Sequence, residues 1–275
     1  MYRIARVGLH HFEEPCLSGE RGSGTIFFCG CNLKCLFCQN FEISHGHNRG
    51  LEINEKQLVD CMLYLQDIGA HNINLVSPSN WCNQLVHTLE VAKSTVKVPI
   101  VWNSSGYETV ANLKKLDGLV DVYLPDFKYS DDNLAWEYSH AKGYADVAYK
   151  AVEEMRRQQP IDVFDDNGIM KKGVIVRHLV LPNAIENTRG VLEKIAEIDR
   201  DMFVSLMGQY FPTENVKEHK SLSRRLTDEE YDRATDAFFK AGLHNGFAQD
   251  LDSATEEYVP SFDLKILRDV LDGSK

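Results

Sequence analysis

The most informative stretch of this sequence is Thr25-Ile-Phe-Phe-Cys-Gly-Cys31-Asn-Leu-Lys-Cys35-Leu-Phe-Cys38-Gln-Asn40. Cys31, Cys35 and Cys38 follow a C-x3-C-x2-C spacing directly after an apolar, β-favouring run. Three thiols this close in sequence must surround one compact object, and a cubane iron–sulfur cluster is the best candidate because thiolates are its preferred ligands. No convincing fourth ligand is nearby, so we expect one iron to lack a protein ligand. An open position of this kind is typical of a catalytic metal site.

This motif resembles the signature of the radical S-adenosyl-L-methionine (SAM) enzymes, including the aromatic Phe37 directly before the last cysteine. The resemblance implies a 4Fe-4S cluster whose open iron binds the amino and carboxylate groups of SAM. It also implies that the reduced cluster cleaves SAM and that the resulting 5′-deoxyadenosyl radical abstracts hydrogen from a substrate. The context Cys38-Gln-Asn40 resembles the pyruvate formate-lyase activating enzymes, and Glu13-Glu-Pro-Cys16 through His45 is similar to an uncharacterised, activase-like branch of that group.

Length and composition restrict the class of protein. A chain of 275 residues is near the upper size of a single hydrophobic core. Acidic residues outnumber basic ones by 41 to 30, so we expect no nucleic-acid partner. No apolar run reaches the ~20 residues of a membrane span, and the first residues lack an apolar signal core, so we expect no membrane association and a cytoplasmic location. Seven cysteines, an odd number, argue against a disulfide scaffold.

Strands and helices are predicted to alternate along most of the chain. This rhythm indicates an α/β fold with a parallel sheet and right-handed crossovers, and by itself it leaves a doubly wound open sheet possible. The resemblance narrows the fold to a partial (β/α)6 TIM-like barrel at residues 25–210, with an N-terminal extension at 1–24 and a C-terminal extension at 211–275. The predicted strands are 25–29, 72–76, 98–102, 119–124, 173–181 and 202–206. The predicted helices are 54–69, 80–94, 107–116, 131–140, 144–158, 186–198 and 226–241, and 258–271 is expected to wrap over the barrel.

In parallel β/α architectures, reactive groups gather where strands end and loops lead into helices. Ser77 follows the second predicted strand, where most activases have a Gly-Gly-Glu pattern that receives the methionine amino group. Asn103 and Ser104 follow the third strand, where the resemblance implies an acid and a small hydroxyl residue near the cofactor. We therefore assign Ser77, Asn103 and Ser104, together with Asn40 of the cysteine motif, to the cofactor site. A plain loop is the alternative reading of each segment.

Charged residues mark the ends of two further strands. Asp126 and Lys128 resemble the Asp-x-Lys element that helps activases bind a monovalent cation and the methionine carboxylate, and alternation places both on one face of an extended segment. An exposed surface ion pair is the alternative. Arg177 and His178 interrupt the fifth strand, and adjacent residues face opposite sides. We expect Arg177 to point inward, where it can pair with a carboxylate, and His178 to face the helices.

The remaining cysteines are expected to pack in the core, although Cys29 could be a spare ligand and Cys16 could have a substrate or redox role. A protein or peptide substrate and a low-potential electron donor of flavodoxin or ferredoxin type are the expected partners. A glycine in a partner protein is one candidate substrate, and a peptide or small molecule is another. The competing hypothesis from a different class is a non-catalytic iron–sulfur or zinc module.

Overall fold

We analysed a computed structural model of the chain. The structure describes residues 1–46, 49–248, 251 and 261–273, and part of the predicted segment 258–271 therefore lies outside the described residues.

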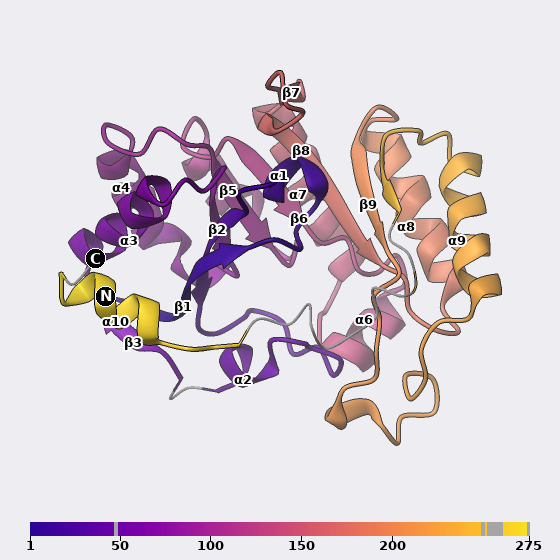
Figure 1. The fold of residues 1–275 in the computed structure, drawn as a ribbon. Coiled ribbons are helices and arrows are strands. Elements are labelled where there is room, and N and C mark those ends of the chain that lie inside the picture. The colour runs from indigo at the N-terminus through magenta and orange to yellow at the C-terminus, as the bar shows by residue number, and fades with distance from the viewer. Residues whose placement is uncertain (47–48, 249–250, 252–260, 274–275) are drawn as a thin grey trace.

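One twisted sheet runs through the molecule, and helices cover its outer face (Figure 1). The strand order is β10-β9-β8-β6-β5-β4-β2-β1-β3, with β7 paired to β8. Neighbours from β2 to β10 are parallel, whereas β1 is antiparallel to both β2 and β3. The sheet is curved but not closed, as expected of a partial barrel. The strands are β1 (Tyr2–His10), β2 (Ser23–Phe28), β3 (Leu51–Ile53), β4 (Ile73–Val76), β5 (Ile100–Ser104), β6 (Val122–Pro125), β7 (Val163–Phe164), β8 (Met170–Leu179), β9 (Phe203–Met207) and β10 (Gly246–Ala248).

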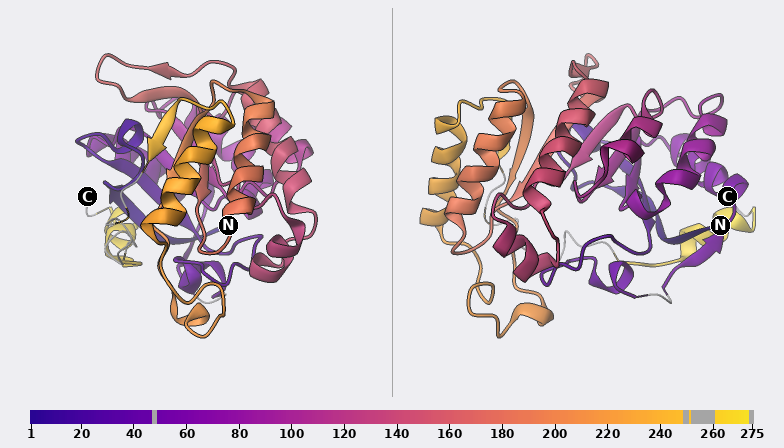
Figure 2. Two further views of the ribbon diagram at one scale, coloured as in Figure 1. Left: turned by 90° about the vertical axis from the view of Figure 1, so that its right-hand side faces the viewer. Right: turned by 180° about the vertical axis from the view of Figure 1, so that it is seen from behind.

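The helices mostly follow the predicted pattern. Asn54 and Thr227 each form a capping box, in which the cap side chain accepts a backbone N–H and the third helical residue bonds back to the cap. Helices α8 and α9 pack side by side next to β9 (Figure 2). The helices are α1 (Pro15–Ser18), α2 (Phe41–Ser44), α3 (Glu55–Asp67), α4 (Cys82–Ala92), α5 (Val110–Leu113), α6 (Asp132–Ser139), α7 (Tyr144–Gln158), α8 (Ile185–Ile198), α9 (Asp228–Lys240) and α10 (Lys265–Leu271).

Several boundaries differ from the prediction. The predicted helix 80–94 begins with a 3₁₀ turn, Ser79–Trp81, and the α-helix that follows has Trp81 at its N-cap without a side-chain bond. The predicted helix 107–116 is reduced to α5 and a 3₁₀ turn, because Thr109 caps it late. Strand β1 was not predicted at all. Helix α10 contacts α3 and β1.

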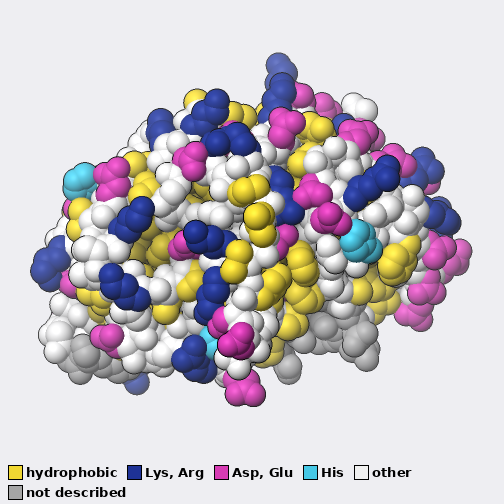
Figure 3. Space-filling view, turned by 90° about the horizontal axis from the view of Figure 1, so that it is seen from above, with side chains coloured by type: hydrophobic (Ala, Val, Ile, Leu, Met, Phe, Trp, Pro, Cys, Tyr) yellow, Lys and Arg dark blue, Asp and Glu magenta, His cyan; other side chains and the backbone are white. Residues whose placement is uncertain are grey.

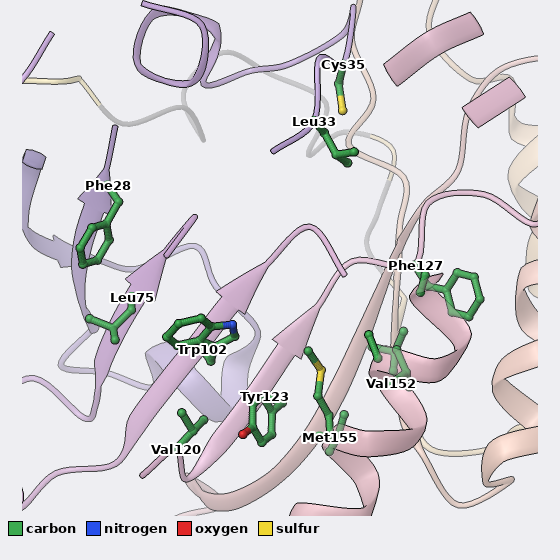
Figure 4. Packing of buried hydrophobic residues seen from close by; sticks show 14 of the residues in the cluster. Phe28, Leu33, Cys35, Leu75, Trp102, Val120, Tyr123, Phe127, Val152 and Met155 are labelled. Atoms are coloured by element: carbon green, nitrogen blue, oxygen red, sulfur yellow. The ribbon is translucent and has the colours of Figure 1, made fainter. Parts of the chain in front are cut away.

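The sheet has two differently packed faces. On the outer face, large apolar side chains of neighbouring strands pack against the helices, as Phe28, Leu75, Trp102 and Tyr123 do in Figure 4. On the inner face, a smaller apolar cluster joins α1 to β5, β6 and β8 through Cys16, Leu17, Val101, Val122, Leu124, Met170 and Ile175. Helix α1 thus fills one end of the barrel interior, and the opposite end, toward which the parallel strands point, is left open.

Candidate active site

A cavity of about 220 Å³ lies at the open end of the barrel. Its lining comes from the loop after β2 and from the carboxyl ends of β4, β5, β6, β8 and β9. The ten side chains that the sequence assigned to the cluster and cofactor all line it: Cys31, Cys35, Cys38, Asn40, Ser77, Asn103, Ser104, Asp126, Lys128 and Arg177. The topology therefore brings together residues that are up to 146 positions apart, from Cys31 to Arg177 (177 minus 31).

The three motif cysteines are free thiols, and each has at least one polar contact that orients it. The Ser139 hydroxyl donates to Cys35 Sγ at 3.0 Å, and the Leu33 N–H donates to Cys31 Sγ at 3.4 Å. Cys38 Sγ lies 3.2 Å from Ser44 Oγ. The loop itself is anchored to the end of α6, because two of its N–H groups donate to the backbone oxygens of Ser139 and Tyr138.

The environment of these thiols suits the binding of metal ions. Burial raises the pKa of Cys31 and Cys38, and it raises that of Cys35 to about 12. The positive charge of Lys128 acts in the opposite direction on all three. Thiolates are the ligand form, so a metal that binds here must itself drive deprotonation. Within the described residues, no group of three or more His, Cys, Asp or Glu side chains is spaced for a single metal ion. In a cubane each cysteine binds a different iron, which requires a wider spacing.

Asp126 and Lys128 form an ion pair beside the thiols, with Lys128 Nζ 2.5 Å from Asp126 Oδ2. The pair is largely buried, with side-chain exposures of 28% for Asp126 and 16% for Lys128, so the solvated surface pair is not what the structure shows. Although burial opposes its charge, the neighbouring carboxylate raises the pKa of Lys128. The Tyr144 hydroxyl accepts the Lys128 N–H and lies 3.0 Å from the Asp126 carbonyl oxygen, which fixes this strand end.

Arg177 points inward from β8, as expected, and its carboxylate partners belong to the chain itself. Its Nε and Nη2 donate to the two oxygens of Glu14 at 2.8 and 2.6 Å, and Nη2 also donates to Glu13. His178 faces the helices, where its ring nitrogens contact the Phe127 carbonyl oxygen and the Thr188 hydroxyl. The inward and outward assignments of the two residues are thus confirmed.

The four remaining predicted site residues differ in whether their polar groups already make hydrogen bonds within the chain. The Ser104 hydroxyl donates to Glu108 Oε2 at 2.5 Å and is buried, so it is already engaged. Ser77 has φ 57°, an unusual left-handed conformation for a residue other than glycine, and its N–H donates to the Asn103 carbonyl oxygen. Asn103 lines the cavity between them. Asn40 lies just before α2, and its backbone oxygen accepts from Ile43 and Ser44.

The sequence did not indicate that the N-terminal segment contributes to the cavity. His10, Phe12, Glu13 and Glu14 all line it, next to Arg177. The sequence feature that could have indicated this contribution is the pair of acids, Glu13 and Glu14, directly before Pro15, at which the short helix α1 begins. This contribution was not predicted, because the site residues were sought directly after the predicted parallel strands, and the N-terminal segment follows none of them.

The other cysteines are buried thiols that do not line the cavity. Cys29 packs with Phe27 and Val76, and its thiol donates to the Arg49 carbonyl oxygen at 3.1 Å. Cys61 and Cys82 lie in α3 and α4 and belong to the main core. Cys16 belongs to the small inner cluster, and burial raises its pKa to about 12. After β9, Gln209 lines the cavity, whereas the Tyr210 hydroxyl donates to the Leu222 carbonyl oxygen.

Known proteins provide an independent comparison. No protein-family model matches the sequence. An uncharacterised protein of Methanocaldococcus jannaschii is 34% identical over 244 residues, which cover 86% of this chain and 66% of that protein. The chain thus spans slightly less than two thirds of this relative.

Solved structures show what the fold is. SuiB of Streptococcus suis, in a structure bound to S-adenosylmethionine, superposes with a TM-score of 0.57 at 13% identity, covering 83% of this chain and 50% of SuiB. The [FeFe]-hydrogenase maturase HydG of Carboxydothermus hydrogenoformans gives a TM-score of 0.55 at 14% identity, covering 91% of this chain and 65% of HydG. The fold is an α/β barrel of the radical SAM type. The chain has the fold of the radical SAM superfamily, as the cysteine motif indicated.

Among the helices that the structure describes, none has the length and apolar character that a membrane span requires.

Proposed function

We propose that this chain is a radical SAM enzyme that binds a 4Fe-4S cluster through Cys31, Cys35 and Cys38 and binds SAM in the adjoining cavity. The observation that carries the proposal is the convergence of three thiols, the Asp126–Lys128 pair and Arg177 on one cavity at the carboxyl ends of parallel strands. Reactive groups of β/α barrels gather at this end.

When bound, the cluster and SAM would supply reductive C–S cleavage and a 5′-deoxyadenosyl radical able to abstract hydrogen. The chain's own groups prepare the site for this. Ser139, Ser44 and the Leu33 N–H hold the sulfur atoms in place through the contacts described above. Hydrogen bonds to the sulfurs and burial are the means by which a protein adjusts the potential of such a cluster.

Lys128 is suited to bind the methionine carboxylate. Among the described residues, its ammonium group has one hydrogen-bond partner, Asp126, and it retains two further donors for an anionic ligand. Asp126 keeps Lys128 charged and aligned, and Tyr144 fixes the backbone of both residues. A buried pair of this kind is stabilised further when a ligand matches its remaining hydrogen-bonding capacity.

Asn40, Ser77, Asn103 and Ser104 are the proposed polar lining around SAM. The Ser77 side-chain oxygen is an acceptor for a ligand ammonium group, because a hydroxyl oxygen has lone pairs that accept hydrogen bonds. Ser104 acts indirectly, because its hydroxyl is bonded to Glu108. Asn103 offers both an amide donor and a carbonyl acceptor in the cavity.

We further propose residues 25–210 as the catalytic barrel, with 1–24 and 211–275 as additions, in a cytoplasmic enzyme reduced by a flavodoxin or ferredoxin. The activase-like motif favours a protein or peptide substrate. A second SuiB structure, bound to the precursor peptide SuiA, superposes with a TM-score of 0.57 over 49% of SuiB, and this likeness supports the proposal of a peptide substrate. An activating enzyme for a glycyl radical enzyme is the specific form of this proposal.

The test is an anaerobic assay of the reconstituted protein with dithionite and SAM. A radical SAM enzyme releases 5′-deoxyadenosine, whereas a non-catalytic iron–sulfur or zinc module does not. Reconstitution should give about four irons per chain, as a single cubane requires. Absence of 5′-deoxyadenosine from protein that carries this iron would refute the enzyme proposal.

A further inference from the structure

Two of the three proposed cluster ligands contact a serine hydroxyl that has a further polar partner behind it. Cys35 Sγ accepts from Ser139, and Cys38 Sγ lies beside Ser44. Ser139 is the last residue of α6 and Ser44 is the last residue of α2, so the two serines come from separate helices. Both helices lie at the lower side of Figure 1, next to the cluster end of the cavity, where the three thiols and Lys128 lie. Figure 3 views the molecule from the opposite side, where the barrel interior is closed.

The serine at Cys35 is backed by a buried tyrosine. The Ser139 hydroxyl donates to Cys35 Sγ at 3.0 Å, and its oxygen lies 2.6 Å from the Tyr129 hydroxyl. Tyr129 is fully buried, and edge-to-face contacts with Tyr138 and Tyr144, at centroid distances of 6.5 and 5.3 Å, hold its ring. Burial raises the pKa of Tyr129 well above its ordinary value, so the phenol keeps its proton. Since the single hydroxyl hydrogen of Ser139 points to the sulfur, Tyr129 is the donor between the two hydroxyls.

The serine at Cys38 is backed by a half-buried histidine. Ser44 Oγ lies 3.2 Å from Cys38 Sγ and 2.8 Å from His45 Nδ1. The imidazole stacks on the Phe41 ring, with centroids 4.4 Å apart and an angle of 19° between the planes, so its orientation is fixed. Burial, and after it the charge of Lys34, lowers the pKa of His45, so the ring is neutral above about pH 7 and has one N–H to donate.

Metal binding would fix the direction of the bonds around Ser44. In the free thiol, Cys38 can donate to Ser44 Oγ, and the serine hydroxyl can turn to the Phe41 carbonyl oxygen, which lies 3.5 Å away. A metal-bound cysteine is a thiolate, and its sulfur only accepts. Ser44 must then donate to Cys38, so the His45 ring must carry its hydrogen on Nδ1 and donate it to Ser44 Oγ. The result is the same order of donors as in the chain from Tyr129 to Cys35.

We propose that Tyr129 and His45 are positioning residues that act through Ser139 and Ser44 to raise the reduction potential of the cluster. Each forms a relay of two hydrogen bonds that ends on a ligand sulfur. One electron from the donor makes the cluster and its thiolates more negative by one unit of charge, and no proton is transferred. Hydrogen bonds to sulfur stabilise this more negative state, and a hydroxyl that itself accepts a hydrogen bond is a stronger donor. The inference rests on the proposed function, because it concerns the cluster that the three cysteines hold.

The test is a redox titration of the reconstituted protein without SAM at about pH 8, in which the electron paramagnetic resonance signal of the reduced cluster gives the midpoint potential. Ser139→Ala and Ser44→Ala should each lower the one-electron reduction constant about tenfold, or about 59 mV, the loss expected for a hydrogen bond to a charged group. Tyr129→Phe and His45→Phe keep a ring and remove the donor, so each should cause a smaller fall. An unchanged potential in either phenylalanine variant would overturn the role of that residue.

Double variants show whether each ring acts through its serine. Adding Tyr129→Phe to Ser139→Ala, or His45→Phe to Ser44→Ala, should cause no further fall, because the serine that transmits the effect is already absent. Variants from different relays should have additive effects, since they act on different sulfurs. Additive falls within one relay would mean that the ring acts by another route, and would refute that relay.

Matched substitutions complete the set. His45→Asn keeps an N–H donor on the atom that corresponds to Nδ1, so it should recover the potential that His45→Phe loses, and a potential equal to that of His45→Phe would contradict a hydrogen-bonding role. Tyr149→Phe and His87→Phe make the same chemical changes on α7 and α4 at side chains that do not line the cavity, and should leave the potential unchanged.

Iron content and 5′-deoxyadenosine release separate this inference from the proposed function. Protein that releases 5′-deoxyadenosine, but whose phenylalanine variants keep the wild-type potential, refutes the relays alone. Protein whose potentials follow the expected pattern, but which releases no 5′-deoxyadenosine, refutes the enzyme proposal alone. Wild-type protein that takes up no iron refutes both. If an alanine variant loses its iron, the phenylalanine variants decide the question, because they retain both serines.

Discussion

The two ends of the barrel interior are built from the same strands but from opposite kinds of side chain. At the open end, Asp126, which directly follows β6, and Arg177 of β8 are neighbours through a parallel bridge. At the closed end, the same two strands contribute Val122 and Ile175, which pack against Cys16 and Leu17 of α1. Along each of these strands, every second side chain points into the barrel, and only a few residues separate those that line the polar cavity from those that form the apolar seal.

Cysteines at the two ends show that burial alone does not reveal the role of a thiol. Burial raises the pKa of both Cys16 and Cys35 to about 12. Their neighbours differ. The Glu14 carboxylate raises the pKa of Cys16 further, whereas the Lys128 ammonium opposes the rise at Cys35. Because Cys16 also has a cationic neighbour, Arg177, it is the two nearby thiols that distinguish the proposed metal ligand from the core thiol.

The largest expected effect tests this difference directly. Cys35→Ala should abolish the bound cluster, because two thiols cannot hold a cubane that already lacks a fourth protein ligand. Iron should fall from about four per chain to near zero, and 5′-deoxyadenosine release should stop. Iron and sulfide analysis after anaerobic reconstitution is the measurement.

Cys16→Ala is the matched control at the closed end and should keep its full iron content. If both variants lost iron equally, the assignment of different roles to the two thiols would be wrong.

The second prediction concerns the seal. Leu17 is fully buried among Val101, Val122 and Ile175, so Leu17→Ala leaves a cavity in the inner cluster. We expect the free energy of unfolding to fall by about 2–5 kcal/mol, measured by urea denaturation. Val91→Ala, at a side chain that is 46% exposed, is the control and should cost little. A loss below about 1 kcal/mol for Leu17→Ala would mean that α1 is not a tightly packed seal.

Much of this architecture could be predicted from the sequence because the parallel strands are apolar and separated by helices of ordinary length. The six predicted strands correspond to β2, β4, β5, β6, β8 and β9, with ends shifted by up to three residues. Helix 144–158 matches α7 at both ends, since a consistent apolar stripe and Gly143 define it.

The elements that escaped prediction lack such local signals. Strand β1 is interrupted by Arg3 and Arg6 and pairs antiparallel to β2, outside the β/α rhythm. Strands β3 and β10 have three residues each. Glu13 and Glu14 could not be placed because their partner, Arg177, is more than 160 positions away, and only the antiparallel return of the chain through the barrel brings them together.

The third prediction tests the cluster end of the cavity. Lys128→Ala should weaken SAM binding by about 10–100-fold, since a hydrogen bond to a charged group contributes about 1.5–3 kcal/mol. Iron content should stay unchanged, because Lys128 is not a sulfur ligand. Equilibrium dialysis with labelled SAM is the measurement, and Lys150→Ala, which removes an exposed helical lysine, is the control. Unchanged affinity in Lys128→Ala would reject its role at the carboxylate.

The smallest expected effect concerns the outer side of β8, one residue from Arg177. Burial lowers the pKa of His178 to about 4, so the imidazole is neutral in the folded protein at neutral pH. Its ring nitrogens contact the Phe127 carbonyl oxygen and the Thr188 hydroxyl. The unfolded chain binds this proton at about pH 6.5. Stability from His178 is therefore fully present above that pH and is lost as the pH falls toward 4.

Between pH 7 and pH 5.5 this amounts to about 1 kcal/mol of unfolding free energy. Urea denaturation at the two pH values measures it, and His178→Gln should reduce the difference by that amount because glutamine does not titrate. An identical pH dependence in the variant would show that protons reach His178 without cost. The outer side of β8 would then be as open as the cavity on its inner side, and the contrast between a packed face and a ligand-binding face would not hold at this strand.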